Sequence, residues 1–254
     1  MARSGGTLIS RCLGAMPGVY VFSEIHPRLG QVSPAYQQAI APQNPFRQAQ
    51  QWYQLFNEQE VRLLQERGAM GFADFMMELY LRIEKRGGTM LIRDWTHLDF
   101  IAKPFLQEPS YQLTTAQLLS ELFTVRSYVT VRHPLDQFLS LARLDVMRGQ
   151  LAALEFFKAY RRFAETAQLV GFTRYEDFTR HPSEKLREIA TALDIPYDSS
   201  ALQRWHTNPH YTGDESKFTV IKPIERKLLD PKQMQQLRQL PDYVQACQAL
   251  GYEL

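Results

Sequence analysis

The earliest residues with recognisable chemistry form a short turn at the start of the chain, Arg3-Ser4-Gly5-Gly6-Thr7. Two glycines, a hydroxyl and a guanidinium stand directly before an apolar-periodic stretch that predicts a helix. Successive backbone N–H groups of such a turn, together with the positive end of the helix, can converge on one anion. The pattern therefore predicts a phosphate-binding loop. An ordinary surface turn is the alternative, because short glycine motifs are not specific.

A second pair of residues could bind an anion in the middle of the chain. Arg132 directly follows an apolar run that predicts a buried strand, and Ser140 lies eight residues later, two turns into the next predicted helix. A guanidinium at a strand end and a hydroxyl on the following helix suit a terminal phosphate that takes several hydrogen bonds. The alternative is a surface arginine that precedes a helix beginning at Pro134.

Three side chains near predicted strand ends could accept a proton. His97 stands shortly after the strand that ends at Ile92, and an imidazole has a pKa suited to general base catalysis. Glu24 and His26 close the strand that begins at Val19 and offer two more candidates. For each histidine, a structural hydrogen-bonding role is the competing interpretation.

The elements that must position these residues alternate between strands and helices. Apolar runs predict strands at 19–23, 89–92, 127–131 and 169–173, and helical periodicity predicts helices at 7–15, 72–86, 135–148, 151–168, 182–193 and 231–250. This alternation predicts an α/β fold with a central, mostly parallel sheet flanked by helices, of the P-loop nucleotide-binding type. Ligands of such folds bind beyond the carboxyl ends of the strands. We expect the aromatic-bearing residues 36–56 and the helix near residues 72–77 to line an apolar acceptor pocket.

Composition limits the classes of function. The 254 residues are 44% hydrophobic, which predicts a single domain over residues 1–254. Lys plus Arg (29) barely exceed Asp plus Glu (27), so neither nucleic acid nor an anionic membrane is expected as a partner. No stretch approaches 18 consecutive apolar residues, and Cys12 and Cys247 are interpreted as reduced core thiols. We expect a cytoplasmic protein. The sequence makes no prediction about its oligomeric state.

Taken in order, these motifs resemble those of the PAPS-dependent sulfotransferases. The match comprises the loop at residues 3–7, Arg132 with Ser140 at the same spacing, and a third block at residues 171–178 that contains Tyr175. The resemblance implies that the cofactor is 3'-phosphoadenosine-5'-phosphosulfate (PAPS) and the product nucleotide is PAP. It implies that the loop binds the 5'-phosphosulfate, that Arg132 and Ser140 bind the 3'-phosphate, and that Tyr175 contacts adenine. Residues 211–217, including Lys217, resemble the loop that closes over the nucleotide.

The resemblance also implies catalytic roles. Arg3 would steady the leaving phosphate, His97 in Thr96-His97-Leu98 would be the base, and Arg93 would contact the sulfuryl group. Glu24 is the second candidate base, because other branches of the family use a glutamate near this point. The predicted reaction moves a sulfuryl group onto a hydroxyl of a small-molecule or carrier-bound acceptor, with no metal requirement.

Two other functions stay open from the residues. A non-catalytic protein of the same fold that binds PAP or PAPS, or serves as a scaffold, would share every binding motif. A kinase-like phosphotransferase is disfavoured because no lysine precedes Thr7, as the nucleotide triphosphatase motif requires. Only Met1 and Ala2 precede Arg3, so the first strand of the family is expected to be missing or truncated, with the loop less firmly held.

Overall fold

The computed structural model describes residues 1–67, 70–213, 219–227 and 229–254. Its strands are β1 (Val19–Ile25), β2 (Thr89–Asp94), β3 (Val129–Val131) and β4 (Phe172–Arg174). Its α-helices are α1 (Gly6–Gly14), α2 (Pro45–Tyr53), α3 (Glu58–Arg67), α4 (Phe72–Glu84), α5 (His97–Phe100), α6 (Thr114–Leu119), α7 (Pro134–Leu141), α8 (Ala153–Val170), α9 (Tyr175–Arg180), α10 (Pro182–Ala192), α11 (Ala201–Arg204), α12 (Pro231–Arg238) and α13 (Pro241–Ala249). Short 3-10 turns are η1 (Pro27–Gln31), η2 (Pro34–Tyr36), η3 (Ala41–Gln43), η4 (Asp145–Met147) and η5 (Trp205–Thr207).

The strands form two small parallel sheets. β1 pairs with β2 from Val19↔Thr89 onward, and β3 pairs with β4 from Val129↔Phe172 onward. The prediction of parallel strands is confirmed. The prediction of one central sheet is corrected to two separate two-stranded sheets, since no pairing joins β2 to β3 among the described residues.

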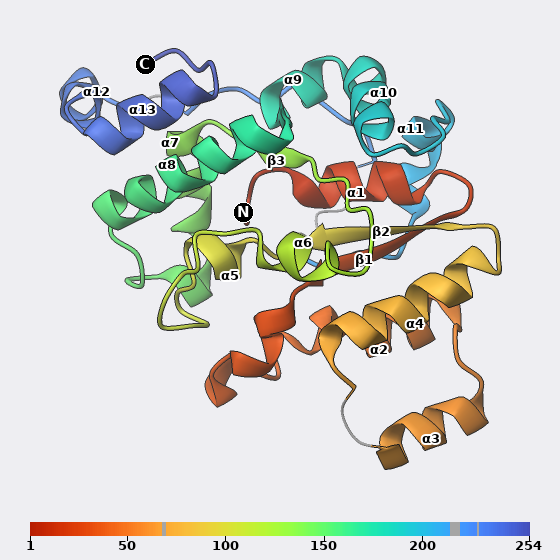
Figure 1. The fold of residues 1–254 in the computed structure, drawn as a ribbon. Helices are drawn as coiled ribbons and strands as arrows, with labels where there is room; N and C mark the ends of the chain where they lie inside the picture. The colour runs from red at the N-terminus through yellow and green to blue at the C-terminus, as the bar shows by residue number, and fades with distance from the viewer. Residues whose placement is uncertain (68–69, 214–218, 228) are drawn as a thin grey trace.

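Helices cover both faces of the sheet formed by β1 and β2 (Figure 1). Val21 packs into the cluster formed with α1 and α10, whereas its neighbour Phe22 packs into the cluster formed with α2 and α4. Successive side chains of a strand point to opposite faces, so the apolar run in β1 serves two helical layers. The result is three layers, with the sheet between two layers of helices. The carboxyl end of β1, at Glu24, reaches the candidate functional site.

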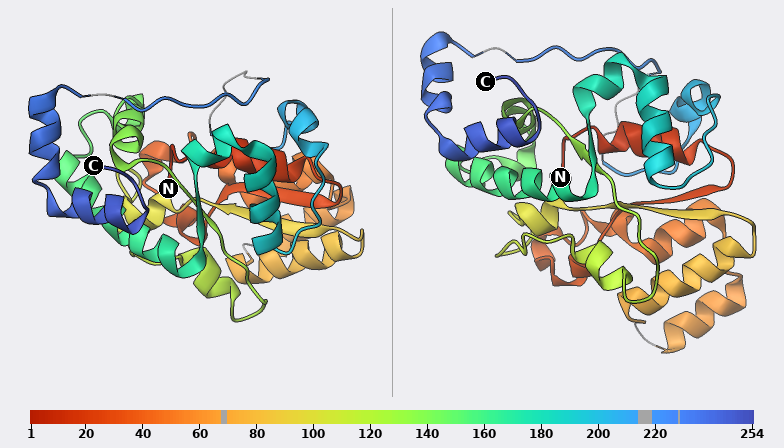
Figure 2. Two further views of the ribbon diagram at one scale, coloured as in Figure 1. Left: turned by 90° about the horizontal axis from the view of Figure 1, so that it is seen from above. Right: turned by 45° about the horizontal axis from the view of Figure 1, so that its top comes forward.

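A second core supports β3. Val131 is buried among residues of α8, including Tyr160 and Phe163, and α13 closes this core with Tyr243 and Cys247. The N-terminus lies toward the middle of the molecule in all three ribbon views (Figures 1 and 2). Met1 and Ala2 are packed against this same core.

Several predicted boundaries differ from the structure. The strand predicted to be buried at residues 89–92 is only half-buried, and the one predicted at 169–173 begins at Phe172 because α8 continues to Val170. Gly171 ends α8 with a φ of 89°, a backbone conformation that favours glycine. The helix predicted at 231–250 breaks into α12 and α13 at Pro241, and the one predicted at 135–148 ends at Leu141.

The two cysteines are free and buried, as predicted. Burial raises the pKa of Cys12 to about 12 and that of Cys247 to about 11, so both thiols are chemically inert. Within the described part of the chain, no helix has both the length and the apolar character needed to cross a bilayer.

Candidate functional site

The loop at residues 3–7 enters α1 through a left-handed turn. Gly5 has a φ of 87°, and the first helical hydrogen bond runs from the N–H of Ile9 to the carbonyl of Gly5. A Cβ atom at Gly5 would lie 2.1 Å from the ring of Tyr175. Only glycine satisfies both conditions, because the conformation and the ring contact each exclude a side chain.

The next residues of the loop lie between the ends of the two sheets. The hydroxyl of Ser4 lies 3.0 Å from that of Thr130 in β3 and donates to the carbonyl of Met1 at 2.8 Å. A Cβ at Gly6 would stand 3.3 Å from Nε of Arg93 in β2 and 3.6 Å from Oγ1 of Thr130. The start of α1 therefore faces the carboxyl ends of β2 and β3, where anion sites form in parallel sheets.

The two predicted anion motifs meet in space. Arg3 donates from Nε to the hydroxyl of Ser140 at 3.0 Å, and Nη1 of Arg132 lies 3.5 Å from the carbonyl of Arg3. Ser140 is on α7, which begins just after β3 ends. Nε of Arg132 is buried and has no hydrogen-bond partner among the described residues. A buried donor without a partner is costly, so this guanidinium is suited to bind an anion.

Sequence reasoning missed a further pair of cations beside this cluster. Arg226 lies 3.2 Å from the buried carboxylate of Asp136, and the backbone N–H of Lys227 donates to the same carboxylate at 2.9 Å. Burial and the nearby guanidinium groups of Arg143 and Arg132 lower the pKa of Lys227. A bound anion would relieve that repulsion. Asp136, at the end of the sequence Arg-His-Pro-Leu-Asp, was the available signal for such a contact. Nothing in the sequence identified Arg226 and Lys227 as its distant partners.

Tyr175 begins α9 directly after β4 and packs on the loop. Its ring contacts Gly5, and the guanidinium carbon of Arg132 lies 5.8 Å from the ring centroid. The third predicted block is thus adjacent to the first two. Lys217, which was predicted to close over the nucleotide, lies outside the described residues.

Glu24 and Arg93 form an ion pair on the opposite side of the loop. Nη2 of Arg93 lies 2.8 Å from Oε1 of Glu24, and the hydroxyl of Thr212 donates to Oε2 at 2.8 Å. Arg93 also donates to the hydroxyl of Ser23 and to the carbonyl of Thr212, each at 3.0 Å. Glu24 has a φ of 55° where the register of β1 with β2 shifts. Such strained backbone is characteristic of functional sites, and here it directs the carboxylate toward the loop.

His97 is held in one tautomer at the start of α5. Its Nε2 lies 2.8 Å from the carbonyl of Lys103, which can only accept a hydrogen bond, so Nε2 carries the proton. Nδ1 is then an acceptor, and it is buried with no partner among the described residues. Burial lowers the pKa of His97 to about 4, which keeps the ring neutral near pH 7.

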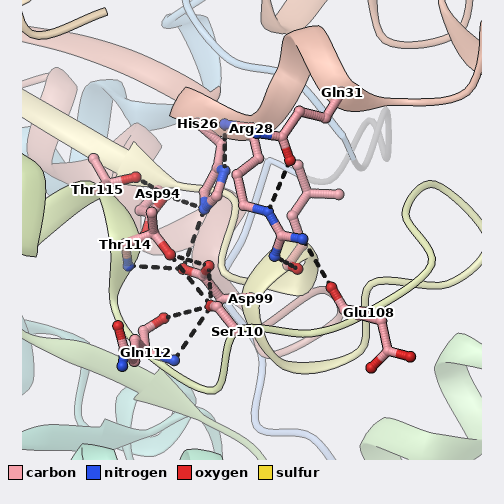
Figure 3. Close-up of polar contacts among 11 residues, drawn as sticks. His26, Arg28, Gln31, Asp94, Asp99, Glu108, Ser110, Gln112, Thr114 and Thr115 are labelled. Carbon is pink, nitrogen blue, oxygen red and sulfur yellow. Dashed lines mark hydrogen bonds and ion pairs between the residues drawn. The ribbon is translucent and has the colours of Figure 1, made fainter.

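His26 has both ring nitrogens engaged (Figure 3). Nδ1 accepts from the N–H of Arg28 at 3.1 Å, and Nε2 lies 3.1 Å from Asp99 and 4.0 Å from Asp94. Ser110 and Thr114 also donate to Asp99. Burial opposes ionisation of Asp99, but the bonds from His26 and these hydroxyls lower its pKa overall. The network leaves His26 without a free lone pair.

Asp94 is the member of this network that reaches the cavity. Its carboxylate accepts from the hydroxyl of Thr115 at 2.7 Å, and its side chain is 19% exposed. Burial raises the pKa of Asp94 to about 6. The three ligand-type atoms of His26, Asp94 and Asp99 lie within 4.8 Å of one another. The proton on Nε2 of His26 nevertheless makes the group a hydrogen-bond network that orients Asp94 and not a set of metal ligands.

One cavity of about 1430 Å³ is lined by several of these groups. Its lining includes the loop at residues 3–7 together with Arg132, Tyr175, Glu24 and His97. Ile40, Trp95 and Phe105 give part of it an apolar wall. The helix near residues 72–77, predicted to line the acceptor pocket, instead contributes Phe75 and Met76 to the core.

Comparison with known proteins gives two structural neighbours. The sulfotransferase domain of the Synechococcus PCC 7002 olefin synthase superposes with a TM-score of 0.58 at 20% identity, covering 99% of this chain and 92% of that domain. The sulfotransferase domain from the curacin biosynthetic pathway gives a TM-score of 0.63 at 16% identity, covering 100% of this chain and 95% of that domain. No protein-family model matches the chain, and no curated protein sequence matches it.

Proposed function

Because the chain has the fold of sulfotransferase domains, we propose that residues 1–254 form a single domain that transfers the sulfuryl group of PAPS to an acceptor hydroxyl. The observation that carries this proposal is the convergence of Arg3, Arg132 and Ser140, which come from two anion motifs 129 or more residues apart. A nucleotide with phosphates at both the 5' and 3' positions needs two such sites side by side.

The chain's own residues fit PAPS. The loop at residues 3–7 offers backbone N–H groups and a helix start to the 5'-phosphosulfate. Arg132 and Ser140 receive the 3'-phosphate, with Lys227 as an additional cation. Tyr175 lies where an adenine ring could stack on it, because its ring covers the loop. The unpartnered Nε of Arg132 supports this assignment, since a phosphate oxygen would satisfy it.

Bound PAPS would supply the sulfuryl group, whose sulfur leaves the bridging phosphate oxygen as it bonds to the acceptor oxygen. Nδ1 of His97 accepts the proton of the acceptor hydroxyl, since the bond to Lys103 leaves that nitrogen's lone pair available. Arg3 and the helix start stabilise the negative charge that develops on the bridging oxygen. Arg93 contacts the sulfuryl oxygens from the other side of the loop.

Glu24 is the second candidate base, and its contact with Arg93 decides between Glu24 and His97. Both carboxylate oxygens of Glu24 are already occupied, Oε1 by the guanidinium of Arg93 and Oε2 by the hydroxyl of Thr212. We therefore assign the proton transfer to His97 and a positioning role to Glu24, which fixes the guanidinium of Arg93. His26 is excluded from direct proton transfer because its acceptor nitrogen, Nδ1, already accepts from the N–H of Arg28.

We propose a small-molecule or carrier-bound alcohol as the acceptor. The apolar wall formed by Ile40, Trp95 and Phe105 suits an alkyl chain next to the reacting hydroxyl. Both structural neighbours are named for biosynthetic proteins, an olefin synthase and the curacin pathway, which is compatible with an acceptor carried on a biosynthetic protein.

Calorimetric titration with PAP tests the nucleotide site. We expect micromolar binding to the native chain, loss of binding in Arg132→Ala, and no binding of ATP. Arg148→Ala is the matched control, because Arg148 pairs with its near neighbour Asp145 and its side chain is 78% exposed. Absence of PAP binding to a folded chain would overturn the proposal. PAP binding without sulfuryl transfer to any alcohol in a panel of free and carrier-bound substrates would instead support a non-catalytic nucleotide-binding protein.

A further inference from the structure

The outer edge of β1 pairs with side chains in place of a strand. β2 occupies one edge of β1, and among the described residues no strand pairs with the other. The hydroxyl of Tyr53 in α2 accepts from the N–H of Val21 and donates to its carbonyl, each at 2.8 Å. Gln48, from the same helix, accepts from the N–H of Ser23 at 2.7 Å and donates to its carbonyl at 2.8 Å. An edge strand lacks backbone partners on its open side, and α2 supplies them here.

The spacing of the two side chains on α2 matches this strand. The helix runs antiparallel to β1, since Gln48 precedes Tyr53 whereas its partner Ser23 follows Val21. Five helical residues advance by about 7.5 Å and two strand residues by about 6.6 Å. Two side chains of one helix therefore reach two successive outward-facing positions of the strand.

The amide of Gln48 has one possible orientation. Its Nε2 also donates to the carbonyl of Pro42 at 2.7 Å, and the residue is only 1% exposed. An amide nitrogen cannot accept a hydrogen bond, so the N–H of Ser23 must meet Oε1 and the two carbonyls must meet Nε2. Gln48 thus fixes both backbone groups of Ser23, one residue before Glu24, where the register of β1 with β2 shifts.

The side chain of Ser23 extends this order to Arg93. Its hydroxyl accepts from Nη1 of Arg93 at 3.0 Å and from the backbone N–H of Thr212 at 3.1 Å. A hydroxyl oxygen has two lone pairs, so both are used. Oγ1 of Thr212 lies 3.0 Å away and can take the hydroxyl proton. The position of the Ser23 backbone therefore determines where the guanidinium of Arg93 lies.

These bonds leave one edge of the Arg93 guanidinium available. Nη1 donates to Ser23 and Thr212, and Nη2 donates to Glu24. Among the described residues, Nε–H and the second N–H of Nη2 have no partner. A Cβ at Gly6 would lie 3.3 Å from Nε and 3.9 Å from Nη2, so this edge faces the loop at residues 3–7. Such a pair of N–H groups can bind two oxygens of one anion.

We propose that Gln48 and Ser23 are positioning residues that direct the Nε–Nη2 edge of Arg93 toward the sulfuryl group. Among the described residues, the lining of the cavity includes neither of them, and it does not include Tyr53. They therefore act on a ligand only through the groups that they hold. The inference rests on the proposed function, because Arg93 is the residue proposed to contact the sulfuryl oxygens.

Solvent exchange of the Arg93 guanidinium protons tests the positioning without any ligand. NMR of the chain with isotope-labelled arginine measures it, and Arg93→Lys identifies the signal. Gln48→Met removes the bonds to Ser23 but keeps an unbranched side chain of similar length. Tyr53→Phe is the matched control, because it removes the two bonds to Val21 on the same edge. Urea unfolding verifies that both variants are folded.

We expect the Nη1 protons of Arg93 to exchange at least about ten-fold faster in Gln48→Met than in Tyr53→Phe or the native chain. Ser23→Ala, which leaves the bonding groups of Gln48 in place, should give the same acceleration and serves if Gln48→Met does not fold. Equal exchange in the native chain and these variants would overturn the proposal.

Sulfuryl transfer from PAPS gives a second readout. Gln48→Met should lower kcat about 10- to 100-fold with little change in KM, whereas Tyr53→Phe should leave kcat within about two-fold. Adding Ser23→Ala to Gln48→Met should cause little further loss, because both changes release the same guanidinium. Fully additive losses in kcat would contradict the proposal.

Failure of this inference is distinguishable from failure of the proposed function. The expected exchange at Arg93 in a chain that binds no PAP would support the positioning by Gln48 and Ser23 and overturn only the contact with a sulfuryl group. Sulfuryl transfer by a chain in which Gln48→Met leaves the exchange at Arg93 unchanged would overturn the positioning alone.

Discussion

Arg3 reaches across the site to donate a hydrogen bond to Ser140, 137 positions away in the sequence, at 3.0 Å. The contact brings the loop at residues 3–7 next to the Arg132 and Ser140 pair, so the two proposed phosphate sites are neighbours. In the proposed complex, oxygens of the 3'-phosphate accept from the Ser140 hydroxyl, which already lies next to a cation.

Ser140→Ala tests the value of that hydroxyl. A hydrogen bond to a charged group contributes about 1.5–3 kcal/mol, so PAP affinity should fall about 10- to 100-fold. Calorimetry measures the change, and Ser120→Ala is the control because Ser120 is exposed and its hydroxyl donates to the nearby carbonyl of Gln117. Unchanged affinity in Ser140→Ala would remove this serine from the site.

Lys227→Met tests the cation that the sequence did not reveal. Removal of one charge from a cluster that holds an anion should weaken PAP binding about ten-fold and reduce its dependence on salt. Lys232→Met on the exposed surface of α12 is the comparison. Equal salt dependence in the two variants would show that Lys227 does not face the nucleotide.

Gly5→Ala should disrupt the loop. Alanine at a φ of 87° costs about 1–3 kcal/mol, and its Cβ would overlap the ring of Tyr175. Urea unfolding should therefore give a lower free energy of unfolding, together with weaker PAP binding. Gly30→Ala is the matched control, because no heavy atom lies within 4 Å of a Cβ built at Gly30. Similar stability of the two variants would contradict the packing of Tyr175 on the loop.

His97 makes stability depend on pH in a defined direction. Its pKa in the folded chain is about 4, below the ordinary 6.5, so the unfolded chain binds more protons between these values. The stabilising contribution is present above pH 6.5 and is lost as the pH falls through about 4, up to about 3 kcal/mol in total. Urea unfolding at several pH values measures it. Between about pH 6.5 and 4, the free energy of unfolding should fall less in His97→Gln than in His181→Gln, where the exposed His181 is replaced as a control. Parallel plots of this free energy against pH for the two variants would refute the assignment.

Local sequence patterns predicted the parts of the site that belong to single elements. The loop before α1 is defined by a turn and a helix start, and Arg132 with Ser140 by a strand end, a turn and a helix start. Such motifs depend on a few neighbouring residues, and the structure brings them together.

Residues that act through distant partners were not predictable in this way. Lys227 lies near Arg3 and Arg132 because its backbone N–H donates to Asp136. No spacing in the sequence links Lys227 to Asp136. The engagement of both nitrogens of His26 likewise depends on Asp99, which lies in a different element. β2 is half-buried because residues 89–94 line the cavity, and an apolar run alone cannot reveal that.

The packing of Tyr175 on Gly5 sets an order for folding during synthesis. The loop leaves the ribosome well before the ring that supports its left-handed turn, because Tyr175 is translated about 170 residues later than Gly5. At about 5–20 residues per second, the loop waits on the order of ten seconds or more before its support exists. The proposed nucleotide-binding loop is therefore organised only after β4 and α9 have been made.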